Sequence, residues 1–283
     1  MSRTVVHSID RRKALGGLAA LLGAAALPAR RAAAQPQESR IALVIGNSAY
    51  RAAPLKNPLS DAGAMAERLK QLGFTVMLRE NTTFTQLLES MQEFSVKAKS
   101  AAVRLVYYAG HGIQSKGRNY LVPIDADVRG EDEISTKSAD VGELVDRLGA
   151  IKQGINIVIL DACRINPFSG GVIVGPDGRR YKFRGSVAPG RAPVDAPLGT
   201  LVAFSTQPNG VAIDGANEDH SIYAKHLLAN LNTPGIEVEQ LFKKVRRAVL
   251  TETQGVQQPW ESSSLTGDFC FKANSAGRCG APL

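Results

Sequence analysis

Residues 155–164 are INIVILDACR, a run of apolar residues that ends abruptly in Asp-Ala-Cys-Arg. A short apolar run rich in β-branched residues and bounded by turn-forming ones predicts a strand buried on both faces. Residues 102–108, AVRLVYY, have the same character and are followed by Ala-Gly-His-Gly. The two segments therefore predict consecutive strands in the middle of a buried sheet.

Outward from these two segments, apolar runs alternate with helical periods along the chain. Strands are expected at 40–47, 74–78, 102–108, 155–160 and 198–204, and helices at 60–72, 83–98, 141–148, 221–231 and 238–253. Alternating strands and helices predict a parallel sheet with helices on both faces. In such sheets a functional site lies at the carboxyl ends of the strands.

His111 and Cys163 each follow the carboxyl end of a predicted strand. A cysteine attacks as the thiolate, and a nearby imidazole can take its proton and later protonate the leaving amine. Glycines on both sides of His111 leave room for a substrate backbone. A packing cysteine and a structural histidine are the alternative interpretation. Placement after two neighbouring strands favours a pair for acyl transfer.

Five strings carry a resemblance to a known family: RIALVIGNSAY (40–50), YYAGHG (107–112), NYLVPIDA (119–126), ILDACR (159–164) and GTLVAFSTQP (199–208). Over about residues 40–271 the chain resembles the caspase clan, and specifically bacterial caspase-like peptidases of the metacaspase type. The resemblance implies a three-layer α/β/α sandwich with a mostly parallel central sheet. It also implies a cysteine endopeptidase with Cys163 as nucleophile, His111 as base, and the amides of Gly112 and Cys163 as oxyanion hole. A catalytically silent caspase-fold scaffold is the alternative.

Asp161 stands where the caspase motif has glutamine. The resemblance to metacaspases implies cleavage after Arg or Lys, with Asp161 and Asp61 in the substrate-binding pocket. A carboxylate recognises a guanidinium through charge-assisted hydrogen bonds. The structural alternatives are that Asp61 decorates the start of its helix and that Asp161 supports the nucleophile loop by hydrogen bonding.

Residues 166–197 form a basic segment rich in glycine and proline. Long loops inside compact domains are usually functional or disordered. In the family that the chain resembles, this segment joins the large and small subunits, so self-cleavage is one interpretation and an uncut flap or β-hairpin is the other. The candidate self-cleavage sites are Arg179, Arg180, Lys182, Arg184 and Arg191.

Composition limits the partners. A hydrophobic fraction of 44% and a charged fraction of 21% exclude a largely disordered chain.

No cysteine or histidine pair has the spacing of metal ligands, so we expect no metal. We also expect no cofactor. Calcium dependence and oligomeric state stay open. Cys270 and Cys279 are either a disulfide or two free thiols. Protein or peptide substrates are expected, without nucleic acid and without stable membrane insertion.

Residues 1–34 combine the pair Arg11-Arg12, an Ala/Gly-rich apolar stretch and a final Ala-Ala-Ala, a pattern typical of a twin-arginine export signal. An amphipathic or disordered tail is the alternative. The chain carries +8, and this segment holds six basic residues and one acidic residue, so the remainder carries +3. We therefore expect a periplasmic protein with a peptidase domain at 35–272 and a C-terminal tail at 273–283.

If the signal is processed, the exported protein begins near Gln35, because cleavage follows small residues. Replacing Arg11 and Arg12 together by lysine should block export, and N-terminal sequencing of the exported form checks the cleavage site. An exported protein that retains Met1 would contradict the prediction.

Overall fold

The computed structural model describes residues 39–51, 53–164, 170–174, 180–184, 194–208, 210–214 and 218–280. The predicted export signal at 1–34 lies outside these residues. No helix in the described ranges is long and apolar enough to cross a membrane.

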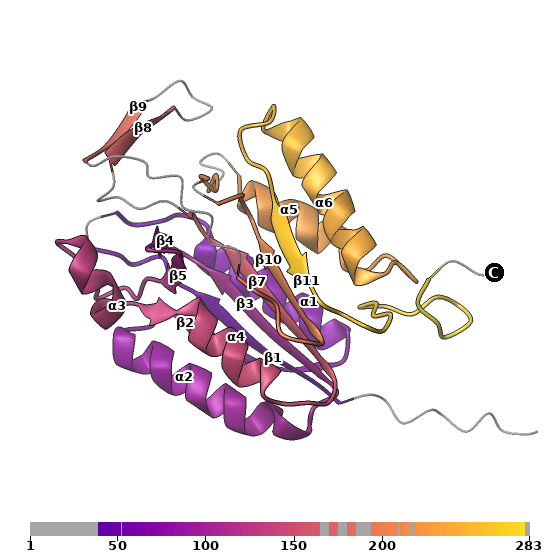
Figure 1. Ribbon diagram of the computed structural model, residues 1–283. Helices are drawn as coiled ribbons and strands as arrows, with labels where there is room; N and C mark the ends of the chain where they lie inside the picture. Colours follow the sequence, from indigo (N-terminus) through magenta and orange to yellow (C-terminus); the bar gives the residue numbers. More distant parts are fainter. Residues whose placement is uncertain are drawn as a thin grey trace, which may run out of the picture. The chain divides into compact units, whose positions relative to one another are not determined.

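Six strands form the central sheet, in the order β11-β10-β7-β3-β1-β2 (Figure 1). Their bounds are β1 (Arg40–Gly46), β2 (Phe74–Glu80), β3 (Val103–Ala109), β7 (Ile155–Asp161), β10 (Thr200–Phe204) and β11 (Trp260–Ser263). All of these strands except β11 are parallel to one another, and they correspond to the five predicted strands. β11 lies at the edge of the sheet and runs antiparallel to β10. The sheet is therefore mostly parallel, as expected.

Helices cover both faces of this sheet (Figure 1). One face carries α1 (Pro58–Gln71), α5 (Ile222–Asn230) and α6 (Val238–Glu252), and the other carries α2 (Phe84–Lys97) and α4 (Val141–Gly149). Strand residues alternate between the two layers, so that Ile157 and Ile159 pack on the first side and Val158 and Leu160 on the second. The three-layer α/β/α sandwich is confirmed.

A small second sheet and several short helical turns lie outside the central sheet and its five helices. A small antiparallel sheet contains β4 (Gly112–Ser115), β5 (Arg118–Leu121) and β6 (Ala139–Asp140). The short helical turns are η1 (Ala98–Ser100), η2 (Glu131–Glu133) and α3 (Ile134–Lys137). β4 begins directly after His111, so the small sheet extends from the edge where the candidate residues lie.

The basic segment after Cys163 contains an antiparallel hairpin of β8 (Gly170–Val174) and β9 (Arg180–Arg184). Three candidate self-cleavage sites, Arg180, Lys182 and Arg184, therefore lie in a paired strand, and Arg179 and Arg191 lie outside the described residues. A protease binds extended chain, so cleavage within β9 would require its pairing to open.

β1 ends against the start of α1, and Gly46 makes the close approach possible. A Cβ at Gly46 would lie 2.5 Å from the carbonyl oxygen of Pro58 and 2.7 Å from Cβ of Ala62. Gly46→Ala should lower the free energy of unfolding by about 1–3 kcal/mol through overpacking, measured by urea denaturation.

Gly63→Ala is the matched control, because a Cβ at this α1 position meets nothing within 4 Å. It should leave stability unchanged or raise it by up to about 1 kcal/mol through helix propensity. A Gly46→Ala protein as stable as the Gly63→Ala protein would show that β1 and α1 are not in close contact.

Candidate active site

The pairing of β3 with β7 brings His111 and Cys163 to one edge of the sheet. Ala109 lies opposite Asp161 in the parallel register, and the Gly110 N–H donates to the Asp161 carbonyl at 3.2 Å. His111 and Cys163 each lie two residues beyond this pair, and both line one cavity of about 70 Å³. The carboxyl ends of neighbouring strands therefore supply a thiol and an imidazole to the same space.

Three hydrogen bonds position His111. Its Nε2 lies 2.7 Å from the carbonyl oxygen of Ala53, its backbone N–H donates to the Tyr50 hydroxyl at 2.9 Å, and its carbonyl accepts from the Tyr108 hydroxyl at 2.9 Å. A carbonyl only accepts, so the neutral ring carries its proton on Nε2 and leaves Nδ1 able to accept one. Burial lowers the pKa of His111, which favours the neutral ring that a general base requires.

Cys163 exchanges hydrogen bonds with the backbone of Ala212, in the segment that follows β10. The Ala212 N–H lies 3.4 Å from Sγ, and the thiol donates to the Ala212 carbonyl at 3.6 Å. Burial raises the pKa of the thiol to about 11, and the nearby charges of Asp161 and Asp214 act in the same direction. In this arrangement Cys163 is a neutral thiol whose sulfur is hydrogen-bonded to the Ala212 backbone.

Three carboxylates line the same cavity: Asp61 from α1, Asp161 from the end of β7 and Asp214 from the segment after β10. Asp61 accepts from the Ser221 N–H at 3.3 Å through both oxygens and from His220 Nδ1 at 2.8 Å. The Ser221 hydroxyl donates to Asp161. Ser221 therefore links two of the three acids, and it also caps α5 by accepting from the Ala224 N–H at 2.9 Å.

The carboxylates raise one another's pKa. Burial is the main cause of the raised pKa of Asp61 and of Asp161, and the charge of Asp61 raises the pKa of Asp161 further. Burial also raises the pKa of Asp214, although the Lys56 N–H donates to it at 2.8 Å. The described residues that line the cavity include no lysine or arginine. A cation entering the cavity would therefore stabilise all three carboxylates.

Gly112 and Cys163 are also brought together. A Cβ at Gly112 would lie 2.6 Å from the carbonyl oxygen of Cys163 and 2.9 Å from Cβ of Ala162. The two backbones approach closely only because residue 112 is glycine. An oxyanion hole built from two backbone amides needs such proximity.

The strand ends indicated His111 and Cys163, and the family resemblance implied Asp61 and Asp161. Three residues that lie beside them were not predicted. Asp214 follows β10, a third parallel strand that ends at the same edge, so the strand-end rule could have found it. His220 and Ser221 lie directly before α5, where no sequence pattern marks a site, and both contact Asp61.

Cys270 and Cys279 form a disulfide in the structure, with their Cα atoms 5.5 Å apart. Of the three cysteines, Cys163 is the free one. The segment at 273–280 folds back, since the Gly280 N–H donates to the Gly235 carbonyl at 2.8 Å. In the described ranges, no group of three or more His, Cys, Asp or Glu side chains is arranged to hold a metal ion.

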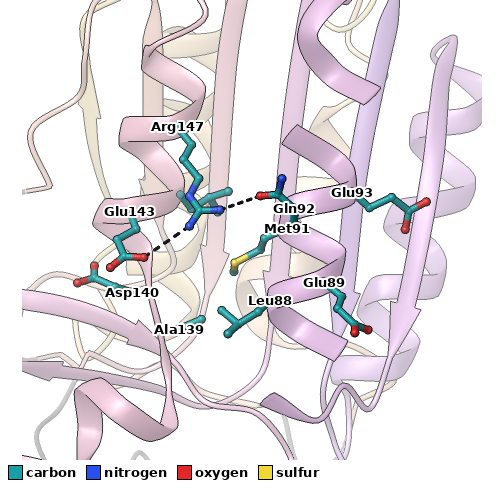
Figure 2. Close-up of a pocket in the computed structure, with 10 residues that line it drawn as sticks. Leu88, Glu89, Met91, Gln92, Glu93, Ala139, Asp140, Glu143 and Arg147 are labelled. Carbon is teal, nitrogen blue, oxygen red and sulfur yellow. Dashed lines mark hydrogen bonds and ion pairs between the residues drawn. The ribbon is translucent and has the colours of Figure 1, made fainter. Parts of the chain in front are cut away.

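A larger groove of about 590 Å³ lies between α2 and α4 (Figure 2). Figure 2 shows Arg147 reaching Gln92 and Glu143, with distances of 3.1 Å and 3.9 Å, beside the apolar side chains of Leu88 and Met91. None of the candidate site residues lines this groove. The candidate thiol, imidazole and carboxylates line the smaller cavity at the strand ends instead.

The chain is similar to known proteins in both sequence and fold. The model of the caspase domain family matches residues 39–270. Human mucosa-associated lymphoid tissue lymphoma translocation protein 1 is 32% identical over 128 residues, and its mouse homologue is 31% identical over 128 residues. Each match covers 45% of this chain but only 15% of the length of the curated relative.

The fold also matches a solved structure. The crystal structure of caspase-1 from Spodoptera frugiperda superimposes with a TM-score of 0.60 at 17% identity. The match covers 84% of this chain and 92% of that chain. At this identity the likeness concerns the fold.

Because burial raises the pKa of Cys163 to about 11, little of the thiol is ionised at neutral pH. Alkylation of the resting protein by iodoacetamide should be slow at pH 7 and rise about tenfold per pH unit up to about pH 9.5, because the thiolate is the reacting form. Mass spectrometry of the labelled protein gives the rates. Cys163→Ala should take up no label, and a rate that levels off below pH 8 would indicate an ionised pair instead.

Proposed function

The chain belongs to the caspase domain family, and on that premise we propose that it is an endopeptidase of the metacaspase type that cleaves after arginine or lysine. Cys163 is the nucleophile and His111 the base. One observation carries the proposal: a single cavity contains the thiol, the imidazole and three carboxylates. The presence of both reactive groups favours turnover over a catalytically silent scaffold.

Substrate has to displace Ala212 from Cys163 before reaction. The thiol then transfers its proton to Nδ1 of His111, and the thiolate attacks the carbonyl carbon of the scissile bond. The oxyanion accepts hydrogen bonds from the amides of Gly112 and Cys163. The imidazolium protonates the leaving amine, and water activated by His111 hydrolyses the thioester to release the acid and restore the thiol.

The carbonyl of Ala53 supports this role of His111. A hydrogen bond from Nε2 to a carbonyl fixes the ring and its tautomer, much as a carboxylate does in other triads. It also stabilises the imidazolium that forms when the thiol ionises, because backbone hydrogen bonding acts to raise the pKa of His111. Ala53 therefore orients the base through its backbone.

Specificity for a basic side chain follows from the charge of the cavity. Asp61 and Asp161 are buried and Asp214 is half-buried beside them, and burial disfavours the ionised form of each. A guanidinium or ammonium group offsets this repulsion and forms charge-assisted hydrogen bonds. An aspartate side chain would add negative charge beside carboxylates whose ionised forms burial already disfavours, and it would be rejected.

Cys163→Ala and His111→Ala should each remove nearly all hydrolysis of a fluorogenic arginyl peptide, and the double variant should be little worse, because groups that act as a unit are non-additive. His226→Ala is the matched control, since His226 pairs with Glu252 on α6 at 2.7 Å and does not line the cavity. Hydrolysis that survives Cys163→Ala would disprove the nucleophile assignment.

Asp61→Asn, Asp161→Asn and Asp214→Asn should each lower kcat/KM for an arginyl peptide at least about tenfold relative to its citrullyl analogue, which has the same shape without the charge. Glu89→Gln, in the groove between α2 and α4, is the control and should leave this ratio unchanged. A preference for aspartyl peptides, or a ratio that none of the three variants moves, would refute the specificity.

A further inference from the structure

His220 lies just before α5 and contacts Asp61. Asp61, Asp161 and Asp214 line the cavity that also contains Cys163 and His111, called here the acid cavity. Its Nδ1 lies 2.8 Å from Oδ1 of Asp61 and 3.5 Å from the hydroxyl of Ser60. The His220 side chain is 30% exposed, whereas that of Asp61 is 1% exposed. Solvent protons can therefore reach the ring, while its carboxylate partner is buried within the cavity wall.

The structure places other charged groups around this contact. Asp61 faces Asp161 and Asp214 across the cavity, and both add negative charge. Among nearby lysines, Lys56 Nζ donates to the Glu218 carbonyl at 3.1 Å, and Lys225 pairs with Glu218 and Glu252. His220 bonds through Nδ1 to Asp61, a carboxylate of the cavity.

We propose that His220 is a specificity-determining residue of the acid cavity, whose protonated ring occupies Asp61 and weakens binding of a basic substrate side chain. The neutral ring still donates its Nδ1 hydrogen to Asp61 and orients it, but leaves the carboxylate charge available to substrate. Imidazole is the side chain whose charge ordinarily changes between about pH 5 and 8. The inference rests on the proposed preference for arginine or lysine.

The sign of the effect is fixed. A positive charge on an imidazole is favoured at lower pH, and such a charge 2.8 Å from Asp61 makes the cavity attract a cation less. Protonation of Asp61 and Asp161, whose pKa values are raised by burial, acts in the same direction. A pH profile of the unaltered protein therefore mixes two causes, and substitutions at residue 220 separate them.

His220→Asn keeps a neutral donor close to the position of Nδ1, whereas His220→Lys supplies a positive charge throughout the range. The measurement is the ratio of kcat/KM for an arginyl peptide to that for its citrullyl analogue between about pH 5.5 and 8.5. Both peptides share the same dyad, so titration of Cys163 and His111 cancels in the ratio. The effect should reside in KM rather than in kcat.

From high to low pH, the ratio should fall about fivefold more in the unaltered protein than in His220→Asn, the scale of a partly exposed charge pair. His220→Lys should give a low ratio at every pH. In the Asp61→Asn background, His220→Asn should make little further difference, because its partner charge is gone. Calorimetric binding of agmatine to the Cys163→Ala protein, with and without His220→Asn, repeats the comparison without turnover.

The outcomes are distinct. Parallel pH profiles for the unaltered protein and His220→Asn, both favouring arginine, would overturn the role of His220 and leave the proposed function intact. Equal rates for arginyl and citrullyl peptides at about pH 8.5, with no agmatine binding, would overturn the basic specificity and the inference together. A high ratio in His220→Lys at low pH would also contradict the inference.

Discussion

The parallel pairing of β3 with β7 is the constraint from which the site is built. Both strands are buried on both faces, so a slip of one residue would exchange the side chains of the two helical layers. Core packing therefore fixes Ala109 opposite Asp161, so that β3 and β7 end at the same position along the sheet. This register places His111 and Cys163 at the same cavity. Gly110 lets the chain pass close to Tyr50, since a Cβ there would lie 2.6 Å from the Tyr50 hydroxyl.

The burial of the site also disfavours the charged forms of Cys163 and His111 in the absence of substrate. The charges of Asp161 and Asp214 add to the effect of burial in raising the pKa of Cys163, while burial lowers that of His111. A basic side chain bound between the carboxylates would offset both negative charges near the thiol. In the proposed mechanism, substrate therefore displaces Ala212 from the sulfur and reduces the electrostatic cost of forming the thiolate.

Local patterns predicted what depends on local physics. Apolar runs located the five parallel strands, and the strand-end rule selected His111 and Cys163. His220 and Ser221 could not be predicted because they contact Asp61 only through folding, from positions about 160 residues further along the chain. The edge strand β11 was missed because its four residues are polar or exposed, and β10 rather than its own sequence imposes its conformation.

The most direct measurement of the central claim is a crystal structure of the protein after inactivation by a peptidyl acyloxymethyl ketone that ends in arginine. The geometry described above predicts a thioether at Cys163 Sγ, a guanidinium bonded to Asp61, Asp161 and Asp214, and Ala212 displaced from the sulfur. Modification of any other residue, or an arginine side chain lying outside this cavity, would contradict it.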